Sequence, residues 1–181
     1  MSMTHVALLR GINVGGKNKL PMKDLTQMFV TAGCSDVRAY IQSGNVIFRP
    51  PAGGVPRLPE LISAQIAKRY GYRIPVVLRT AAQMDHVVRH NPFLPAGAAE
   101  TDLHVLFLLD LPAPRCLQDL DPTHWLPDTF SVRGQEVYLW LPNGTARTKL
   151  NNQYFDSRLA TTSTGRNWRT VTTLLEMMTA Q

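Results

Sequence analysis

The sequence predicts an α+β protein built from two similar halves, and three observations support this fold class. Short runs of β-forming residues alternate with segments whose apolar side chains recur at helical spacing. In residues 1–79 these segments follow the order strand, helix, strand, strand, helix, strand, which is typical of a ferredoxin-like fold. Residues 80–181 repeat the strand, helix and hairpin and end in a helix. We therefore expect two ferredoxin-like (βαββαβ-related) halves with antiparallel sheets, divided after residue 79.

Glycine, proline and turn-forming residues bound the elements expected in the first half. The strands are expected at residues 5–9, 37–41, 46–48 and 74–78. The helices are expected at residues 21–32 and 58–70, each ending before a glycine. The turn-forming residues 42–45 join the second and third strands into a hairpin.

The second half carries the same kinds of signal. Its strands are expected at residues 103–109, 130–132 and 137–141. Its helices are expected from Thr80 or Asp85 through His90, at residues 112–120, and from about Asn167 onward. We expect residues 161–169 to open the last helix, with Gly165 loosening its start.

The amino-acid composition limits the kinds of protein and partner that the sequence allows. With 44% hydrophobic and 18% charged residues the chain has the composition of a folded globular protein. Its 19 basic and 13 acidic residues give a net charge of +6, which favours anionic partners of unspecified kind.

The sequence also bears on localisation. No apolar run approaches the ~18 residues of a membrane span, and no signal peptide is evident, so we expect a cytoplasmic protein that does not bind membranes. The two cysteines, without a C-x-x-C pair, predict neither a disulfide framework nor structural zinc.

The loop Arg10–Lys19 is the most informative segment. It joins a strand to a helix, and its glycines let backbone amides approach a ligand while its lysines supply positive charge. Gly11, Gly16 and Lys17 match most of a P-loop pattern, but Asn18 replaces the hydroxyl residue that would hold Mg²⁺. Two interpretations remain for this loop: a cradle for phosphate or another oxyanion, and a glycine-rich connection with solvated lysines.

Similar chemistry recurs in the second half. Residues 144–152 and 161–169 concentrate hydroxyl, amide and guanidinium groups. In the simpler interpretation Thr162, Ser163 or Thr164 is an N-cap and Trp168 a core residue. Together with the first hairpin, these segments supply the candidate ligand-binding residues. They are Arg10, Asn13, Gly15, Gly16, Lys17, Lys19, Ser43, Asn45, Arg147, Lys149, Arg166 and Asn167.

Other sites are disfavoured by the sequence. His86 and His90 are spaced to share a helix face but have no third ligand at metal-site spacing, so no metal and no cofactor are expected. No nucleophile, general base or carboxylate pair stands out, so catalytic residues are unknown and enzymatic activity stays undecided. The aromatic motif of RNA-binding ferredoxin-like sheets is missing.

Four motifs resemble one family. They are the segment Val6-Ala-Leu-Leu-Arg-Gly-Ile-Asn-Val-Gly-Gly, the hairpin Tyr40-Ile-Gln-Ser-Gly-Asn-Val-Ile-Phe, Arg147-Thr-Lys-Leu, and Thr164-Gly-Arg-Asn-Trp. In this order they are similar to the uncharacterised bacterial family called domain of unknown function 1697. The resemblance implies two ferredoxin-like halves and a bacterial source, and it implies no activity.

Three functional hypotheses follow. In the first, the two basic loops converge with Arg166 and Asn167 on a phosphate-bearing small molecule or a nucleic acid. In the second, the same residues stabilise charge in an enzyme that acts on a phosphorylated small molecule. In the third, the basic segments only solvate a structural or interaction module. The sequence does not determine the oligomeric state.

Overall fold

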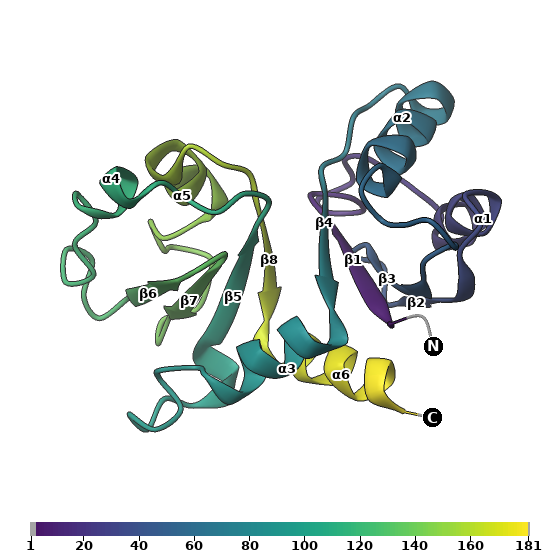
Figure 1. Ribbon diagram of the computed structural model, residues 1–181. Helices are drawn as coiled ribbons and strands as arrows, with labels where there is room; N and C mark the ends of the chain where they lie inside the picture. The colour runs from purple at the N-terminus through teal and green to yellow at the C-terminus, as the bar shows by residue number, and fades with distance from the viewer. Residues whose placement is uncertain (1–2, 181) are drawn as a thin grey trace. The chain divides into compact units, whose positions relative to one another are not determined.

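The computed structural model describes residues 3–180, which form two compact units. One unit comprises Met1–Met84 and Leu174–Gln181, and the other comprises Asp85–Thr173. Each unit is a four-stranded antiparallel sheet with two helices in βαββαβ order, so the predicted fold class is confirmed. Each unit's own elements are labelled in Figure 1.

The first unit has the element order that the sequence predicts. Its elements are β1 (His5–Leu9), α1 (Met22–Thr31), β2 (Ser35–Tyr40), β3 (Asn45–Arg49), α2 (Leu58–Tyr70) and β4 (Val76–Thr80). The strand order β2-β3-β1-β4 places β1 between β3 and β4, antiparallel to both. The strand β4 begins two residues later than predicted, because Pro75 has no N–H to donate to the neighbouring strand. Its carbonyl accepts a hydrogen bond from the N–H of Arg10 (3.1 Å).

The second unit repeats this topology. Its elements are β5 (Leu103–Leu108), α4 (Pro114–Leu117), β6 (Thr129–Arg133), β7 (Glu136–Trp140), α5 (Asn152–Leu159) and β8 (Ser163–Asn167), with strand order β6-β7-β5-β8. The helices α3 (Ala81–Arg89) and α6 (Trp168–Thr179) and the 3₁₀ turn η1 (Glu100–Asp102) complete the chain.

The sequence missed two elements of the second unit. Residues 163–167 form the strand β8 and do not open the last helix, which begins at Trp168. The prediction that Gly165 loosens a helix start is therefore wrong. A Cβ on Gly165 would lie 2.9 Å from Leu106 Cδ2, so a glycine permits close packing against β5. The short helix α5 was also missed, because only Phe155 and Leu159 supply its buried face.

The helices of each unit cover one sheet face with an apolar cluster. In the first unit Ala7, Leu9 and Phe48 from the sheet pack with Phe29 of α1 and Ile62 of α2. In the second unit the corresponding cluster joins sheet residues of β5, β6 and β7 to α5. Alternating residues of the same strands point to the opposite sheet face, because side chains alternate along a strand.

Each sheet carries one buried arginine at an equivalent position on that opposite face. Arg79 of β4 is paired with Val6, and Arg166 of β8 is paired with Val105. In both, Nη1 donates a hydrogen bond to the carbonyl of the preceding residue, at 2.8 Å from Arg79 and 2.7 Å from Arg166. This shared arrangement supports a structural repeat, which sequence identity alone was too weak to reveal.

The described residues contain no helix that combines the length and the hydropathy that a membrane span requires.

The first hairpin supplies a test of packing in the first unit. Gly44 has φ +79°, and a Cβ there would lie 2.8 Å from Leu9 Cβ. We expect Gly44→Ala to lower the free energy of unfolding by about 2–4 kcal/mol, from backbone strain and overpacking together.

Gly71→Ala is the matched control, because Gly71 has φ +81° with nothing within 4 Å of the added Cβ. Its expected loss is only about 1 kcal/mol. Equal losses for the two variants in urea denaturation would show that the close contact at Gly44 does not matter.

Candidate functional site

Three connections gather at one end of the first sheet. Since β1 is antiparallel to β3 and β4, the end of β1 adjoins the start of both neighbours. The loop after β1, the β2–β3 turn and the connection before β4 therefore share this end, as Figure 1 shows for the loop after β1 and the segment entering β4. We call it the basic end of the first unit, defined by Arg10, Lys17, Lys19, Lys23 and Arg73.

Hydrogen bonds fix the backbone of this end. The N–H of Leu9 donates to the carbonyl of Gly44 (2.8 Å), and the N–H of Arg10 donates to that of Pro75 (3.1 Å). The Tyr72 hydroxyl donates to the carbonyl of Lys19. The loop that carries the lysines is thus held to both neighbouring connections.

The loop itself is a small hairpin and not a phosphate-binding P-loop. The N–H of Lys17 donates to the carbonyl of Val14 (3.0 Å), and Gly15 and Gly16 between them have φ values of +56° and +75°. Such a turn needs positive φ at both central positions, which explains the Gly-Gly pair. The helix α1 begins at Met22, five residues after Lys17, so Lys17 does not lie on its first turn.

Two predicted ligand-binding asparagines have a structural role. Asn13 Nδ2 donates to the carbonyls of Leu20 (2.8 Å) and Gln42 (2.9 Å), and its Oδ1 accepts from the N–H of Leu20 (2.8 Å). Asn45 is fully buried, and its Nδ2 donates to the carbonyl of Tyr40 (3.1 Å) and to Ser43 Oγ (3.0 Å). These side chains therefore support the loops, and a ligand contact of Asn13, Ser43 or Asn45 stays a prediction.

The positive charge of the chain is concentrated in the first unit. That unit has 11 Lys or Arg and 4 Asp or Glu residues, for a formal charge of +7, whereas the second has 8 and 9, for a charge of −1. Lys17, Lys19, Lys23 and Arg73 are exposed and form no ion pair among residues 3–180. The net positive charge of the chain therefore belongs to the first unit.

Arg166 does not belong to an exposed site. It is 7% exposed, and its Nη1 donates to Thr164 Oγ1 (2.9 Å) and to the carbonyl of Gly165 (2.7 Å). Burial lowers its pKa to about 10, so the guanidinium remains charged at neutral pH. Asn167, beside it, is exposed and caps α6 by accepting from the N–H of Thr170 (2.8 Å). The sequence suggested ligand contacts here because residues 163–167 were assigned to the start of the last helix, where backbone N–H groups are free, and not to the strand β8.

The other predicted residues of the second unit, Arg147 and Lys149, are exposed in the connection between β7 and α5. Arg147 lines a cavity of about 470 Å³ with Trp125 and Asp128. Trp125 packs against the helix-side cluster, whereas Arg166 lies on the opposite sheet face, so the structure does not bring Arg147 and Arg166 together. Convergence of the Arg10–Lys19 loop with Arg147 stays a prediction, since the two segments belong to different units.

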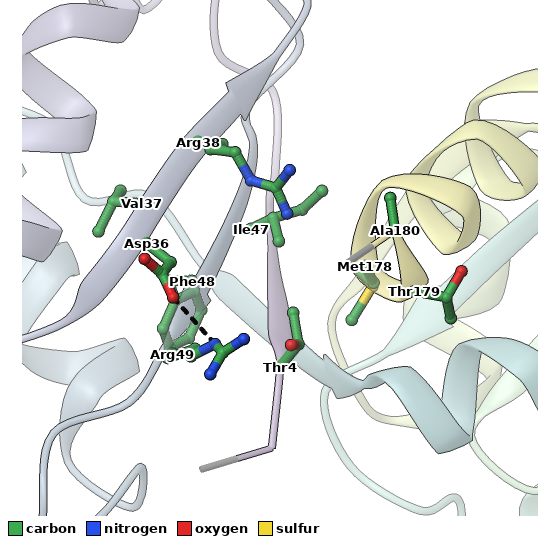
Figure 2. Close-up of a pocket in the computed structure, with 10 residues that line it drawn as sticks. All are labelled: Thr4, Asp36, Val37, Arg38, Ile47, Phe48, Arg49, Met178, Thr179 and Ala180. Carbon is green, nitrogen blue, oxygen red and sulfur yellow. Dashed lines mark ion pairs between the residues drawn. The ribbon is translucent and has the colours of Figure 1, made fainter. Parts of the chain in front are cut away.

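A further cavity in the first unit, of about 500 Å³, lies between the β2–β3 edge and the end of α6 (Figure 2). Its two cations are already engaged. Arg49 Nε pairs with Asp36 Oδ2 at 2.9 Å, and Arg38 Nη2 donates to the carbonyl of Met177 at 2.8 Å. Figure 2 shows Arg38 directed toward the helix and Arg49 toward Asp36, so this cavity offers less free charge than the basic end.

The described histidines form no three-ligand metal cluster, and the Cys34 thiol is buried. The rings of His86 and His90 stack at 3.9 Å, and residues 3–180 contain no group of three or more His, Cys, Asp or Glu side chains that could hold a metal ion. Burial raises the pKa of the Cys34 thiol, which lowers its reactivity at neutral pH.

Fold and site define an α+β protein of two ferredoxin-like units with a basic end on the first. Residues 3–138 match the family described as "Protein of unknown function (DUF1697)", and the chain belongs to this family. It is similar in structure to the conserved bacterial protein SP0830 from Streptococcus pneumoniae, with a TM-score of 0.72 and 21% identity over 98% of this chain and 99% of the other. At this identity the likeness shows the fold alone. No functionally curated protein is significantly similar to the chain in sequence.

The buried position of Arg166 can be tested through stability. We expect Arg166→Ala to lower the free energy of unfolding by about 2–4 kcal/mol, because Thr164 Oγ1 and the Gly165 carbonyl lose their donor. The exposed Arg169 is the control, and Arg169→Ala is expected to change stability by less than about 0.5 kcal/mol. Equal stability of both variants in thermal denaturation would contradict the structural role.

His104 supplies a test of pH dependence. Burial lowers the pKa of His104 below its usual value of 6.5, so the imidazole is neutral in the folded chain and protonates more readily in the unfolded chain. Stability is therefore lost as the pH falls below 6.5 toward the folded-state pKa. We expect His104→Gln to flatten this part of the stability profile, measured by urea denaturation at several pH values. An unchanged profile would show that other groups cause the acid sensitivity.

Proposed function

We propose that this protein binds a phosphate-bearing or otherwise polyanionic ligand through the basic end of the first unit. The observation that carries the proposal is the charge distribution: the first unit has a formal charge of +7, and four exposed cations without ion-pair partners come from three neighbouring segments. Like charges held close together repel one another, and an anion that binds among them removes this repulsion.

The geometry of the basic end favours an extended anion over a deeply enclosed one. Lys17 extends from a two-residue turn, Lys19 is anchored through its carbonyl by Tyr72, and Lys23 lies in the first turn of α1. The partial positive charge at the start of α1 adds to the potential of these side chains. The cavities of about 500 and 470 Å³ are lined by other residues, not by Gly15 or Gly16. An enzyme that acts on a phosphorylated small molecule stays the alternative function.

The test compares binding of a fluorescent single-stranded oligonucleotide and of ATP to the wild type and to Lys17→Gln/Lys19→Gln/Arg73→Gln. For the triple variant we expect at least tenfold weaker binding of the ligand that the protein recognises. If that ligand is the oligonucleotide, the slope of log affinity against log salt becomes less steep by about 2, since each lost phosphate contact contributes about 0.7.

A charge-matched control removes three exposed cations of the second unit, in Arg115→Gln/Arg158→Gln/Arg169→Gln. This variant has the same net charge as the test variant, so it separates a local site from a general effect of charge. Equal losses in both variants would show that net charge alone causes the binding. Unchanged affinity in the test variant, or no binding of either probe by the wild type, would refute the proposal.

A further inference from the structure

The second unit contains a cavity whose chemistry differs from that of the basic end. Its volume is about 470 Å³, within the range of small-molecule sites. One side is the turn that precedes β6, with Trp125, Pro127 and Asp128, and the other is the connection after β7, with Asn143 and residues 146–148. These two segments meet because Thr129 at the start of β6 is paired with Trp140 at the end of β7.

Two buried polar atoms of this lining have no hydrogen-bond partner among residues 3–180. They are Nε1 of Trp125 and Oδ1 of Asp128. Asp128 is only 9% exposed, so its carboxylate is largely withdrawn from water. Buried polar groups in proteins are nearly always hydrogen-bonded, and a buried carboxylate is nearly always compensated by a cation or by several donors.

The two atoms have opposite hydrogen-bonding character. An indole N–H can only donate, and an ionised carboxylate can only accept. The N–H of Asp128 donates to the carbonyl of Trp125 (3.0 Å), so a closed turn holds both residues. Trp125 also packs against the apolar cluster under α5. The turn and the cluster therefore hold the two residues together in the lining of the cavity.

Arg147 adds a positive charge to the same cavity. It is exposed, and no ion pair joins it to Asp128 or to another acid among the described residues. Because no ion pair joins them, the carboxylate and the guanidinium can each bind a ligand group of opposite charge. The complementary ligand then carries a cation for Asp128 and an anion for Arg147.

From this arrangement we propose that the cavity is a binding site for a small zwitterion. Its ammonium group binds the carboxylate of Asp128, and its carboxylate or phosphate accepts from the Trp125 N–H and the Arg147 guanidinium. Free α-amino acids and aminoalkyl phosphates share this chemistry. The site lies wholly within the second unit and does not rest on the function proposed for the first.

Trp125 provides a direct readout of binding. The chain has three tryptophans, so its ¹H–¹⁵N spectrum contains three indole N–H signals, and Trp125→Phe identifies the one of interest. Individual L-amino acids and phosphoethanolamine are the probes, and acetate, methylamine and GMP are the comparison ligands. We expect a zwitterion to shift the Trp125 signal downfield in a saturable manner, with the Trp140 and Trp168 signals as internal references. A response to amino acids or to phosphoethanolamine tells which anionic group the site prefers.

Two substitutions test the assigned contacts. Asp128→Asn keeps the shape of the side chain but removes its charge, and Arg147→Gln removes the guanidinium. Each is expected to weaken zwitterion binding by about tenfold or more, because each removes a contact with a charged group. Arg115→Gln, an exposed residue of α4, is the control and should bind as the wild type does.

Stability separates ligand binding from a structural role. If Asp128 serves the ligand, Asp128→Asn leaves the melting temperature unchanged or raises it, because a buried unpaired charge is removed. A lowered melting temperature would assign Asp128 to the fold and overturn the proposal. The proposal also fails if no zwitterion shifts the Trp125 signal at about 10 mM, where sites with millimolar affinity saturate. Wild-type affinity in both variants, or a response to GMP without a response to any zwitterion, would overturn it as well.

Discussion

The structure depends on antiparallel pairing of one central strand with two neighbours in each unit. In the first unit β1 pairs with β3 and β4, and in the second β5 pairs with β7 and β8. This pairing places the end of the central strand beside the start of both neighbours, so three connections share one end of each sheet. It also sets the register that buries Arg79 and Arg166 at equivalent positions, each bonded to the preceding carbonyl. The location of the exposed cations and the burial of these two arginines have the same cause.

The two units use equivalent scaffolds for different chemistry. The N–H of Leu9 donates to the Gly44 carbonyl in the first unit, as the N–H of Leu108 donates to the Gln135 carbonyl in the second, both at 2.8 Å. The first unit nevertheless has a formal charge of +7 and the second of −1. The binding proposed for the basic end relies on long-range attraction of exposed charges, which salt screens. The zwitterion binding proposed for the Trp125–Asp128–Arg147 cavity combines the exposed guanidinium of Arg147 with buried polar atoms of Trp125 and Asp128, whose interactions are screened less.

Asparagine and glycine at the basic end illustrate why residue types alone do not establish a ligand contact. Gly15 and Gly16 satisfy the positive φ of a turn, and Asn13 holds the loop to Leu20 and Gln42. The same residue types occur in anion-binding loops because both situations need unusual backbone conformations and spare hydrogen-bonding groups. Only the three-dimensional structure shows whether such groups already bond to other parts of the protein. Here the side-chain amides of Asn13 and Asn45 are used, whereas Lys17, Lys19, Lys23 and Arg73 form no ion pair within residues 3–180.

The sequence by itself determined the fold class, most helices and strands of the first unit, and the family, because these follow from local apolar periodicity, turn residues and motif order. It failed at β8, where Ser163-Thr164-Gly165-Arg166 lacks the apolar alternation of a strand and is held in place by pairing with β5. It also gave no signal for Trp125 and Asp128, which lie in a polar, proline-containing segment. Tertiary structure decided which charges are exposed, which amides are engaged and which buried groups lack partners. These properties depend on contacts between residues far apart in the chain, which local patterns do not encode.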